Sequence, residues 1–156
     1  ERSLMDSRRE RFLTVPVVFG ICLAAVAGTA TVFYQTRVAN PNVDEYFSFL
    51  TIGRLLVITH VHIFGYSTMG FILWTLGRRQ GAGTNPIFGT LLGLTVCAGI
   101  LDILSWWGVV YVSPIFRFLT FAMGAAFVAG ILLSGLMVLL ACRRSALVEH
   151  DFKKER

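Results

Sequence analysis

The sequence has few charged residues for its length. Only 15% of its 156 residues are charged, whereas 55% are hydrophobic, and the mean hydropathy is +0.69. A soluble domain usually has about 25% charged residues and about 45–50% apolar ones. The composition excludes a water-soluble monomer and indicates a small integral membrane protein, with residues 1–156 forming a single transmembrane domain.

Cysteine is also scarce. Cys22, Cys97 and Cys142 lie within or at the end of apolar runs, and no CxxC or CxxCH spacing occurs. This pattern excludes a disulfide framework and a covalent haem c site, so the cysteines are expected to be small packing residues. The formal charge of +5 comes from short basic clusters beside apolar segments. Such clusters are typical of membrane topology signals, so no nucleic acid partner is expected.

Four apolar runs are long enough to cross a hydrocarbon core of about 30 Å, which takes about 20 helical residues. They cover residues 12–34, 54–76, 87–110 and 115–142. Open strands would leave backbone groups unpaired in lipid, so an all-α, four-helix membrane bundle is expected. Asn85 before Pro86, and Ser113 before Pro114, predict the starts of the last two helices, because each pairs a capping residue with proline at the first helical position.

Basic residues are concentrated on one side of the expected membrane. Eleven of the 14 Lys and Arg residues precede the first span, join the second to the third, or follow the fourth. An excess of Lys and Arg marks cytoplasmic segments. Both termini are therefore expected in the cytoplasm, with the chain crossing the inner membrane four times. A basic start before an apolar run also fits a signal peptide, but this run continues to Tyr34, so an uncleaved anchor is expected.

Small residues recur at every fourth position in three spans. Lipid provides no hydrophobic drive for helices to meet, so these stripes are expected to be packing seams. The stripes provide more helix surface suited to close contact than four helices alone would use. This favours other subunits of a membrane complex as partners. The stripes are Gly20, Ala24 and Gly28; Gly89, Gly93 and Cys97; and Ala122, Ala126, Gly130 and Ser134.

Ionisable residues within spans are costly and usually face the protein interior. His60 and His62 are expected about one turn below the outer end of the second span. Asp102 is expected one turn inside an outer aromatic belt formed by Trp106 and Trp107. These three ionisable side chains therefore share one layer near the outer face. Met123, Tyr66 and Ser105 fall within about a turn of the same layer.

Residues two apart on a helix point about 200° from each other. His60 and His62 therefore suit two different partners. They would form one metal site only with a distorted helix or with ligands from another chain. The arrangement resembles locally the His-x-His of haem-copper oxidases, in which neighbouring histidines on one helix face two haems. The likeness covers Thr59 to His62 and is a precedent for the geometry.

Two redox ligands fit this layer. Haem b takes an axial His with a second His or a Met across the ring. Because His150 is expected in the cytoplasmic tail, the second ligand would come from Met123, another copy or a partner. A quinol would instead give its proton to His62, His60 or Asp102, since His titrates near neutral pH.

Two further cofactor contacts are expected. Tyr66 lies close to the histidine layer. Arg54 lies at the headgroup level, where it either anchors the helix or pairs with an acidic partner such as a haem propionate. The segment Val43–Gly53 is expected to be an amphipathic extension of the second helix, with a docking surface for an extracytoplasmic redox protein.

The sequence thus predicts a membrane subunit of a respiratory-type electron-transfer complex. His60 and His62 bind haem b or contact quinol, and Asp102 accepts a proton or orients a histidine. Two alternatives stay open. One is a structural subunit that packs beside catalytic chains, with the histidines and Asp102 only locking the bundle. The other is a metal-binding membrane subunit. A transporter is not favoured, since no broken-helix pair or inverted repeat is evident.

Overall fold

The computed structural model describes residues 2–39 and 43–154, and the side chains of residues 10–39 and 45–147. Asn40 to Asn42 lie outside the described residues, and so do the side chains of His150 and of the basic residues before Glu10. The described part of the chain is all-helical. Its elements are α1 (Arg2–Tyr34), a π-helical segment (Gln35–Ala39), α2 (Val43–Ser48), α3 (Ile52–Arg79), a 3-10 turn (Ala82–Thr84), α4 (Pro86–Tyr111) and α5 (Phe116–Lys154).

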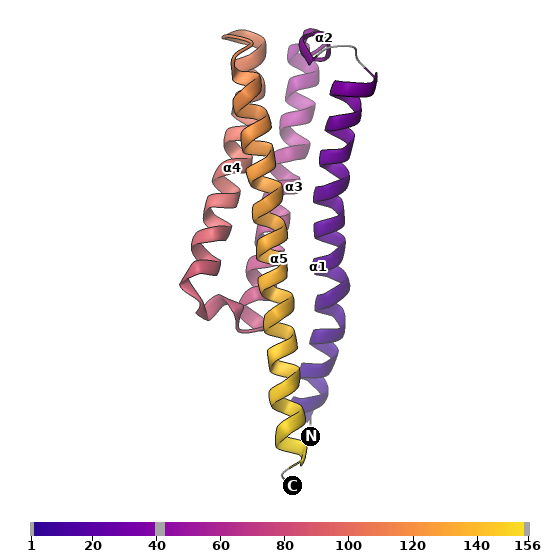
Figure 1. The fold of residues 1–156 in the computed structure, drawn as a ribbon, viewed down its shortest axis with the longest axis vertical. Coiled ribbons are helices and arrows are strands. Elements are labelled where there is room, and N and C mark those ends of the chain that lie inside the picture. The colour runs from indigo at the N-terminus through magenta and orange to yellow at the C-terminus, as the bar shows by residue number, and fades with distance from the viewer. Residues whose placement is uncertain (1, 40–42, 155–156) are drawn as a thin grey trace.

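Four helices are long and apolar enough to cross a membrane, which confirms the predicted number of spans. They cover Glu10–Ala39, Ile52–Arg79, Pro86–Tyr111 and Phe116–Leu147. The four helices run alternately up and down, so both termini lie at one end of the bundle and α2 lies at the other (Figure 1). For convenience, the end that carries α2 is called the α2 end.

The helix starts follow from local capping. Asn85 caps α4, because its side chain accepts the N–H of Ile87 at 2.9 Å with Pro86 at the first position, as predicted. Helix α5 begins at Phe116, two residues later than Pro114, because the backbone first makes a turn in which the Ser113 carbonyl accepts the Phe116 N–H. Thr51 caps α3, and the sequence reading missed this cap.

The segment Val43–Gly53 differs from the prediction. It is not an extension of α3, because α2 ends at Ser48 and the chain turns before Thr51. The turn places Phe47 and Leu50 in a buried cluster with Leu55 and Trp106. The α2 segment therefore closes the top of the α3–α4 pair with apolar side chains.

The main core lies between the four long helices. Its fully buried side chains include Val18 of α1, Leu73 of α3, Phe88 of α4 and Ile131 of α5. At the end opposite α2, the buried Gln80 amide donates to the Thr14 hydroxyl at 3.2 Å, which ties α1 to the end of α3.

The small-residue stripes correspond only in part to seams within this chain. Gly130 and Ser134 are buried, as predicted. All three members of the α1 stripe are exposed, whereas this helix packs through Val18, Ile21 and Ala25. The seam prediction is therefore wrong for α1 within one chain. The exposed members are Gly20, Ala24, Gly28, Gly93, Cys97, Ala122 and Ala126.

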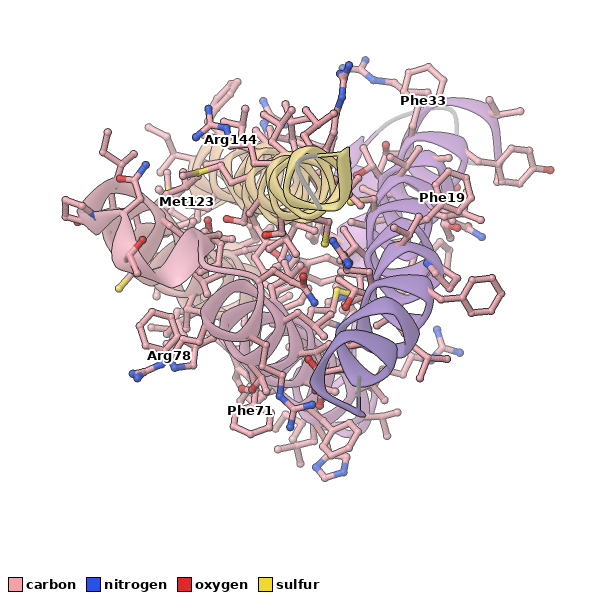
Figure 2. All side chains as sticks on the ribbon, turned by 90° about the horizontal axis from the view of Figure 1, so that it is seen from below. Phe19, Phe33, Phe71, Arg78, Met123 and Arg144 are labelled. Carbon is pink, nitrogen blue, oxygen red and sulfur yellow. The ribbon has the colours of Figure 1, made fainter. Side chains whose placement is uncertain are left out.

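Large apolar side chains cover the outside of the bundle. Phe19, Phe33 and Phe71 project away from it in the view along its axis (Figure 2), and between 63% and 70% of each side chain is exposed. A soluble protein rarely exposes so much contiguous apolar surface. The arrangement fits a multi-pass membrane protein whose outer face meets lipid or other membrane chains.

We predict that Gly130→Ala destabilises the bundle. A Cβ at this position would lie 2.9 Å from Cβ of Thr95, so α4 and α5 would have to move apart. Overpacking of this kind costs about 1–3 kcal/mol. The free energy of unfolding, measured with a denaturing detergent, should fall by about this amount. Gly93→Ala is the matched control, because a Cβ there meets nothing within 4 Å. Equal stability of the two variants would contradict the packing described here.

Candidate functional site

A buried carboxyl group is the centre of the candidate site. Asp102 of α4 is only 5% exposed. Its Oδ2 accepts the Tyr66 hydroxyl of α3 at 3.0 Å, and its Oδ1 accepts Nε1–H of Trp106 at 3.2 Å. Asp102 and Trp106 are four residues apart on one helix, a spacing that brings side chains together. Both carboxyl oxygens are therefore held by donors from the chain itself.

These two donors differ in what they allow. An indole N–H can only donate, whereas a phenol hydroxyl can donate or accept. Oδ1 must therefore be an acceptor toward Trp106 whether Asp102 is ionised or neutral. When Asp102 is neutral, a proton on Oδ2 can be donated to the Tyr66 hydroxyl, which then reverses its role and accepts. The contact with Tyr66 thus lets Oδ2 exchange a proton with the phenol hydroxyl.

His62 lies beside this group. Its ring is 5.4 Å from the Tyr66 ring and 5.8 Å from the Trp106 ring, measured between centroids. Its Nδ1 is 2.8 Å from the Ile58 carbonyl, which can only accept, so Nδ1 carries a hydrogen. In neutral His62 this makes Nε2 an acceptor. Within the described residues, Nε2 has no hydrogen-bond partner, so it is the ring atom that remains to contact a ligand.

Further hydrogen bonds hold the surrounding helices in place. The Ser105 and Thr120 hydroxyls are 2.7 Å apart and join α4 to α5. Nε1–H of Trp107 donates to the Thr59 hydroxyl at 2.9 Å and joins α4 to α3. Polar contacts between membrane helices contribute about 0.6 kcal/mol each on average. These contacts fix the positions of the side chains around Asp102.

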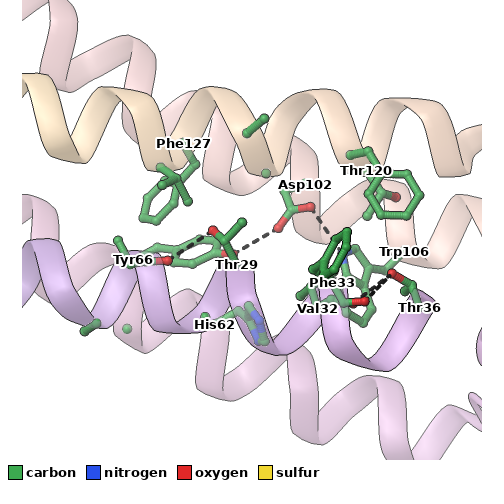
Figure 3. A pocket seen from close by; sticks show the side chains of 18 of the residues that line it. Thr29, Val32, Phe33, Thr36, His62, Tyr66, Asp102, Trp106, Thr120 and Phe127 are labelled. Atoms are coloured by element: carbon green, nitrogen blue, oxygen red, sulfur yellow. Dashed lines mark hydrogen bonds between the residues drawn. The ribbon is translucent and has the colours of Figure 1, made fainter. Parts of the chain in front are cut away.

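The polar group lines a cavity of about 520 Å³. The cavity lies against α1, α3 and α5, and Asp102 and Trp106 of α4 complete its wall. Figure 3 shows His62, Tyr66 and Asp102 opposite the α1 side chains Thr29, Val32, Phe33 and Thr36. Ligand sites of proteins commonly have volumes of about 300–1,000 Å³, apolar walls and a few polar groups. This cavity has that character.

Glycines give the cavity its width. Gly28 of α1 and Gly65 of α3 both line it, and a Cβ added to either would meet nothing within 4 Å. A Cβ at Gly124 of α5 would lie 3.5 Å from Oδ1 of Asp102. A larger residue at Gly124 would therefore contact the carboxyl group, and larger residues at Gly28 or Gly65 would take up cavity space.

The structure brings together only part of the predicted site. His62, Tyr66 and Asp102 share the cavity, whereas His60 is exposed and does not line it. Met123 is half-buried and packs against the main core, away from the cavity lining. Arg54 is exposed, and its guanidinium donates to the Phe49 carbonyl at 3.1 Å.

Trp106 is the main functional residue that the sequence reading placed wrongly. It was expected in an outer aromatic belt, but it is 7% exposed and donates to Asp102. The four-residue spacing from Asp102 was the signal for this contact. Arg37, at the end of α1, also lines the cavity and was not predicted to do so. No motif marks this residue in the sequence.

The donor set does not form a compact metal centre. In the described part of the chain, no three His, Cys, Asp or Glu residues gather around a point that would hold a metal ion. For haem b, His62 offers one axial nitrogen. The lining residues of α1 and α5 include no His or Met to face it across a ring, and Met69 lies on the same helix as His62. A six-coordinate haem here would need a ligand from another chain.

Comparisons with known proteins do not place the chain in a family. It matches no protein-family model, no curated protein and no solved structure.

We predict that Tyr66 and Asp102 are energetically coupled. A double-mutant cycle with Tyr66→Phe, Asp102→Asn and the double variant isolates their interaction. Interhelical hydrogen bonds in membrane proteins give about 0.6 kcal/mol on average and up to about 1.7 kcal/mol. The free energy of unfolding in bicelles measures the coupling. A second cycle that pairs Thr75→Val with Asp102→Asn is the control. The Thr75 hydroxyl of α3 donates only to a carbonyl of its own helix, so this cycle should show no coupling. Additive losses for Tyr66 and Asp102 would contradict the contact.

Proposed function

We propose that the chain is a membrane subunit of an electron-transfer complex and binds a quinol in the Asp102 cavity. The observation that carries the proposal is the position of three side chains that can carry a proton, His62, Tyr66 and Asp102, on one wall of a mostly apolar cavity. Ionisable groups within membrane spans are rare and commonly mark ligand or proton pathways.

The chemistry of a quinol matches this wall. A quinol is a flat ring with two hydroxyl groups and an apolar tail, so it needs a wide, apolar space with hydrogen-bond partners at the ring. Gly28 and Gly65 provide the space. Nε2 of neutral His62 can accept a hydrogen bond from one hydroxyl, and the Tyr66–Asp102 pair can accept from the other.

Oxidation of a bound quinol releases two protons and two electrons and leaves a quinone. In the proposal, His62 takes one proton on Nε2. The Tyr66 hydroxyl takes the second proton and passes its own to Oδ2 of Asp102. The two electrons reduce two one-electron redox centres of a partner subunit. This chain supplies the binding site and the proton acceptors, and the partner supplies the oxidant.

Haem b is the second ligand class expected from the sequence, and one observation favours it. His62 has an Nε2 atom available beside the cavity. The walls opposite it carry hydroxyl and aromatic side chains such as Thr29 and Phe33. A quinol needs only a hydrogen-bond acceptor such as His62 and these hydroxyl and aromatic neighbours. A six-coordinate haem needs a second axial ligand in addition to His62. The quinol is therefore the better fit, and a metal site formed by His60 and His62 together is not supported.

Two sequence features extend the proposal. The excess of Lys and Arg at the end that carries the termini supports a cytoplasmic position for both. The cavity, which lies toward the α2 end, would then be in the outer half of the inner membrane. The exposed small residues outside the cavity support contact with other subunits, because such residues allow close helix approach. They are Gly20, Gly93, Cys97, Ala122 and Ala126.

We predict that His62→Ala weakens quinone binding about tenfold. Loss of one hydrogen bond costs about 0.5–1.5 kcal/mol, and about 1.4 kcal/mol corresponds to a factor of ten in affinity. Titration of a short-tailed benzoquinone or naphthoquinone into the full chain in lipid nanodiscs gives the dissociation constant. His60→Ala is the matched control, because this residue is on the same helix and is exposed.

A second pair of variants tests the space itself. Gly65→Leu fills the cavity and should abolish binding, whereas Gly53→Leu on the same helix points into open space outside the cavity and should leave binding intact. The proposal is wrong if the quinone binds no better than to empty nanodiscs, or if both histidine variants behave alike. In that case the role as a structural subunit is favoured. A haem absorption band lost in His62→Ala would instead favour the haem assignment.

A further inference from the structure

The α2 end of the cavity carries a positive charge that the quinol proposal does not use. Arg37 lies in the π-helical segment Gln35–Ala39 that ends the first span, and its side chain lines the cavity. The residue is exposed, and in the described part of the chain it makes no ion pair. A guanidinium group presents several donors in a planar fork that matches phosphate oxygens.

Arg37 is well separated from the polar group. It follows Thr29 by eight residues, and Thr29 faces the Tyr66 level in Figure 3. At a rise of 1.5 Å per residue, this places Arg37 about 12 Å nearer the α2 end. An anionic group at Arg37 would therefore lie at the end of the span, where lipid headgroups are found, and nearer the α2 end than Tyr66.

The space below Arg37 suits an acyl chain. On α1 the cavity wall continues along a mostly apolar surface in which Thr29 is the one hydroxyl residue. This surface consists of Phe33, Val32, Thr29, Gly28, Ala25 and Ala24. The rim is open, since Phe33 is 63% exposed and Val61 of α3 is 60% exposed. A chain from the surrounding bilayer can enter between these two helices while its headgroup stays at Arg37.

The local fold supports the position of Arg37. The buried Thr36 hydroxyl donates to the Val32 carbonyl at 2.8 Å, a contact that commonly bends helices. The π-helical turn widens the helix at the same place, and such turns often occur at functional sites. Thr36 and Arg37 both lie in this π-helical segment, and both line the cavity.

We infer that this cavity also binds an anionic phospholipid, with the phosphate at Arg37 and one acyl chain between α1 and α3, in competition with the quinol. The competition rests on the proposed function, whereas the lipid site does not. The occupant is a lipid rather than a free phosphate because the charge lies at the open end of an apolar space.

The experiment uses the full chain in phosphatidylcholine nanodiscs with spin-labelled phosphatidylglycerol or phosphatidylcholine as probes. The wild type should immobilise the anionic probe in preference to the zwitterionic one. Arg37→Gln should lower this preference about fivefold, the effect of one cation near a membrane surface, and Arg37→Lys should restore most of it. Arg54→Gln is the matched control, because it removes the same charge at the same end of the bundle outside the cavity lining.

Gly65→Leu separates a cavity site from simple attraction to the protein surface. The variant keeps Arg37 but fills the space below it, so the immobilised component should disappear. Unchanged selectivity in Arg37→Gln, or an unchanged immobilised component in Gly65→Leu, would overturn the inference. Free inorganic phosphate that displaces the probe at millimolar concentration would also overturn it, because the site would then not be specific for a lipid.

Competition is measured separately. Phosphatidylglycerol should raise the apparent dissociation constant of the quinone for the wild type but not for Arg37→Gln. If no quinone binds in either lipid while the Arg37-dependent lipid signal persists, the proposed function has failed and the lipid site stands. If the quinone binds but phosphatidylglycerol has no effect on it, the competition is wrong.

Discussion

The site depends on one constraint, the pairing of both oxygens of a carboxyl group buried among membrane helices. A polar group in this environment is costly unless it has partners. Tyr66 and Trp106 provide them for Asp102, and the Tyr66 bond fixes α3 relative to α4. The same two rings hold His62 at the edge of the group. The hydrogen bonds that pack these helices therefore also hold a potential proton acceptor in position.

The cavity exists because α1 packs closely along only half of its length. Its buried residues occur every three or four positions from Thr14 to Ala25, and the next buried residue is Thr36. Beyond Ala25 the helix carries Gly28 and Thr29, which are too small to reach α3 and α5. The polar wall on α3 and α4 is therefore left facing a space rather than a neighbouring side chain. This local choice of small residues converts a buried polar contact into a candidate binding site.

Much of this arrangement is predictable from the sequence, but its details are not. Span lengths and the Asn85 cap follow from local rules, and helical rise placed His62, Tyr66 and Asp102 in one layer. Helical geometry also required His60 and His62 to face opposite ways. It did not show which one faces inward, because that depends on how α3 rotates against its neighbours. The rotations of α4 and of the end of the first span likewise place Trp106 inside the bundle and Arg37 at the cavity, and no sequence periodicity specifies them.

The most direct test of the account is photolabelling of the full chain in nanodiscs with an azido-quinone, followed by peptide mapping. The label should be found on cavity residues such as His62, Tyr66 and Thr29, and excess unlabelled quinone should prevent the labelling. Label distributed over the exposed face around His60 and Phe64, with no protection by unlabelled quinone, would contradict it.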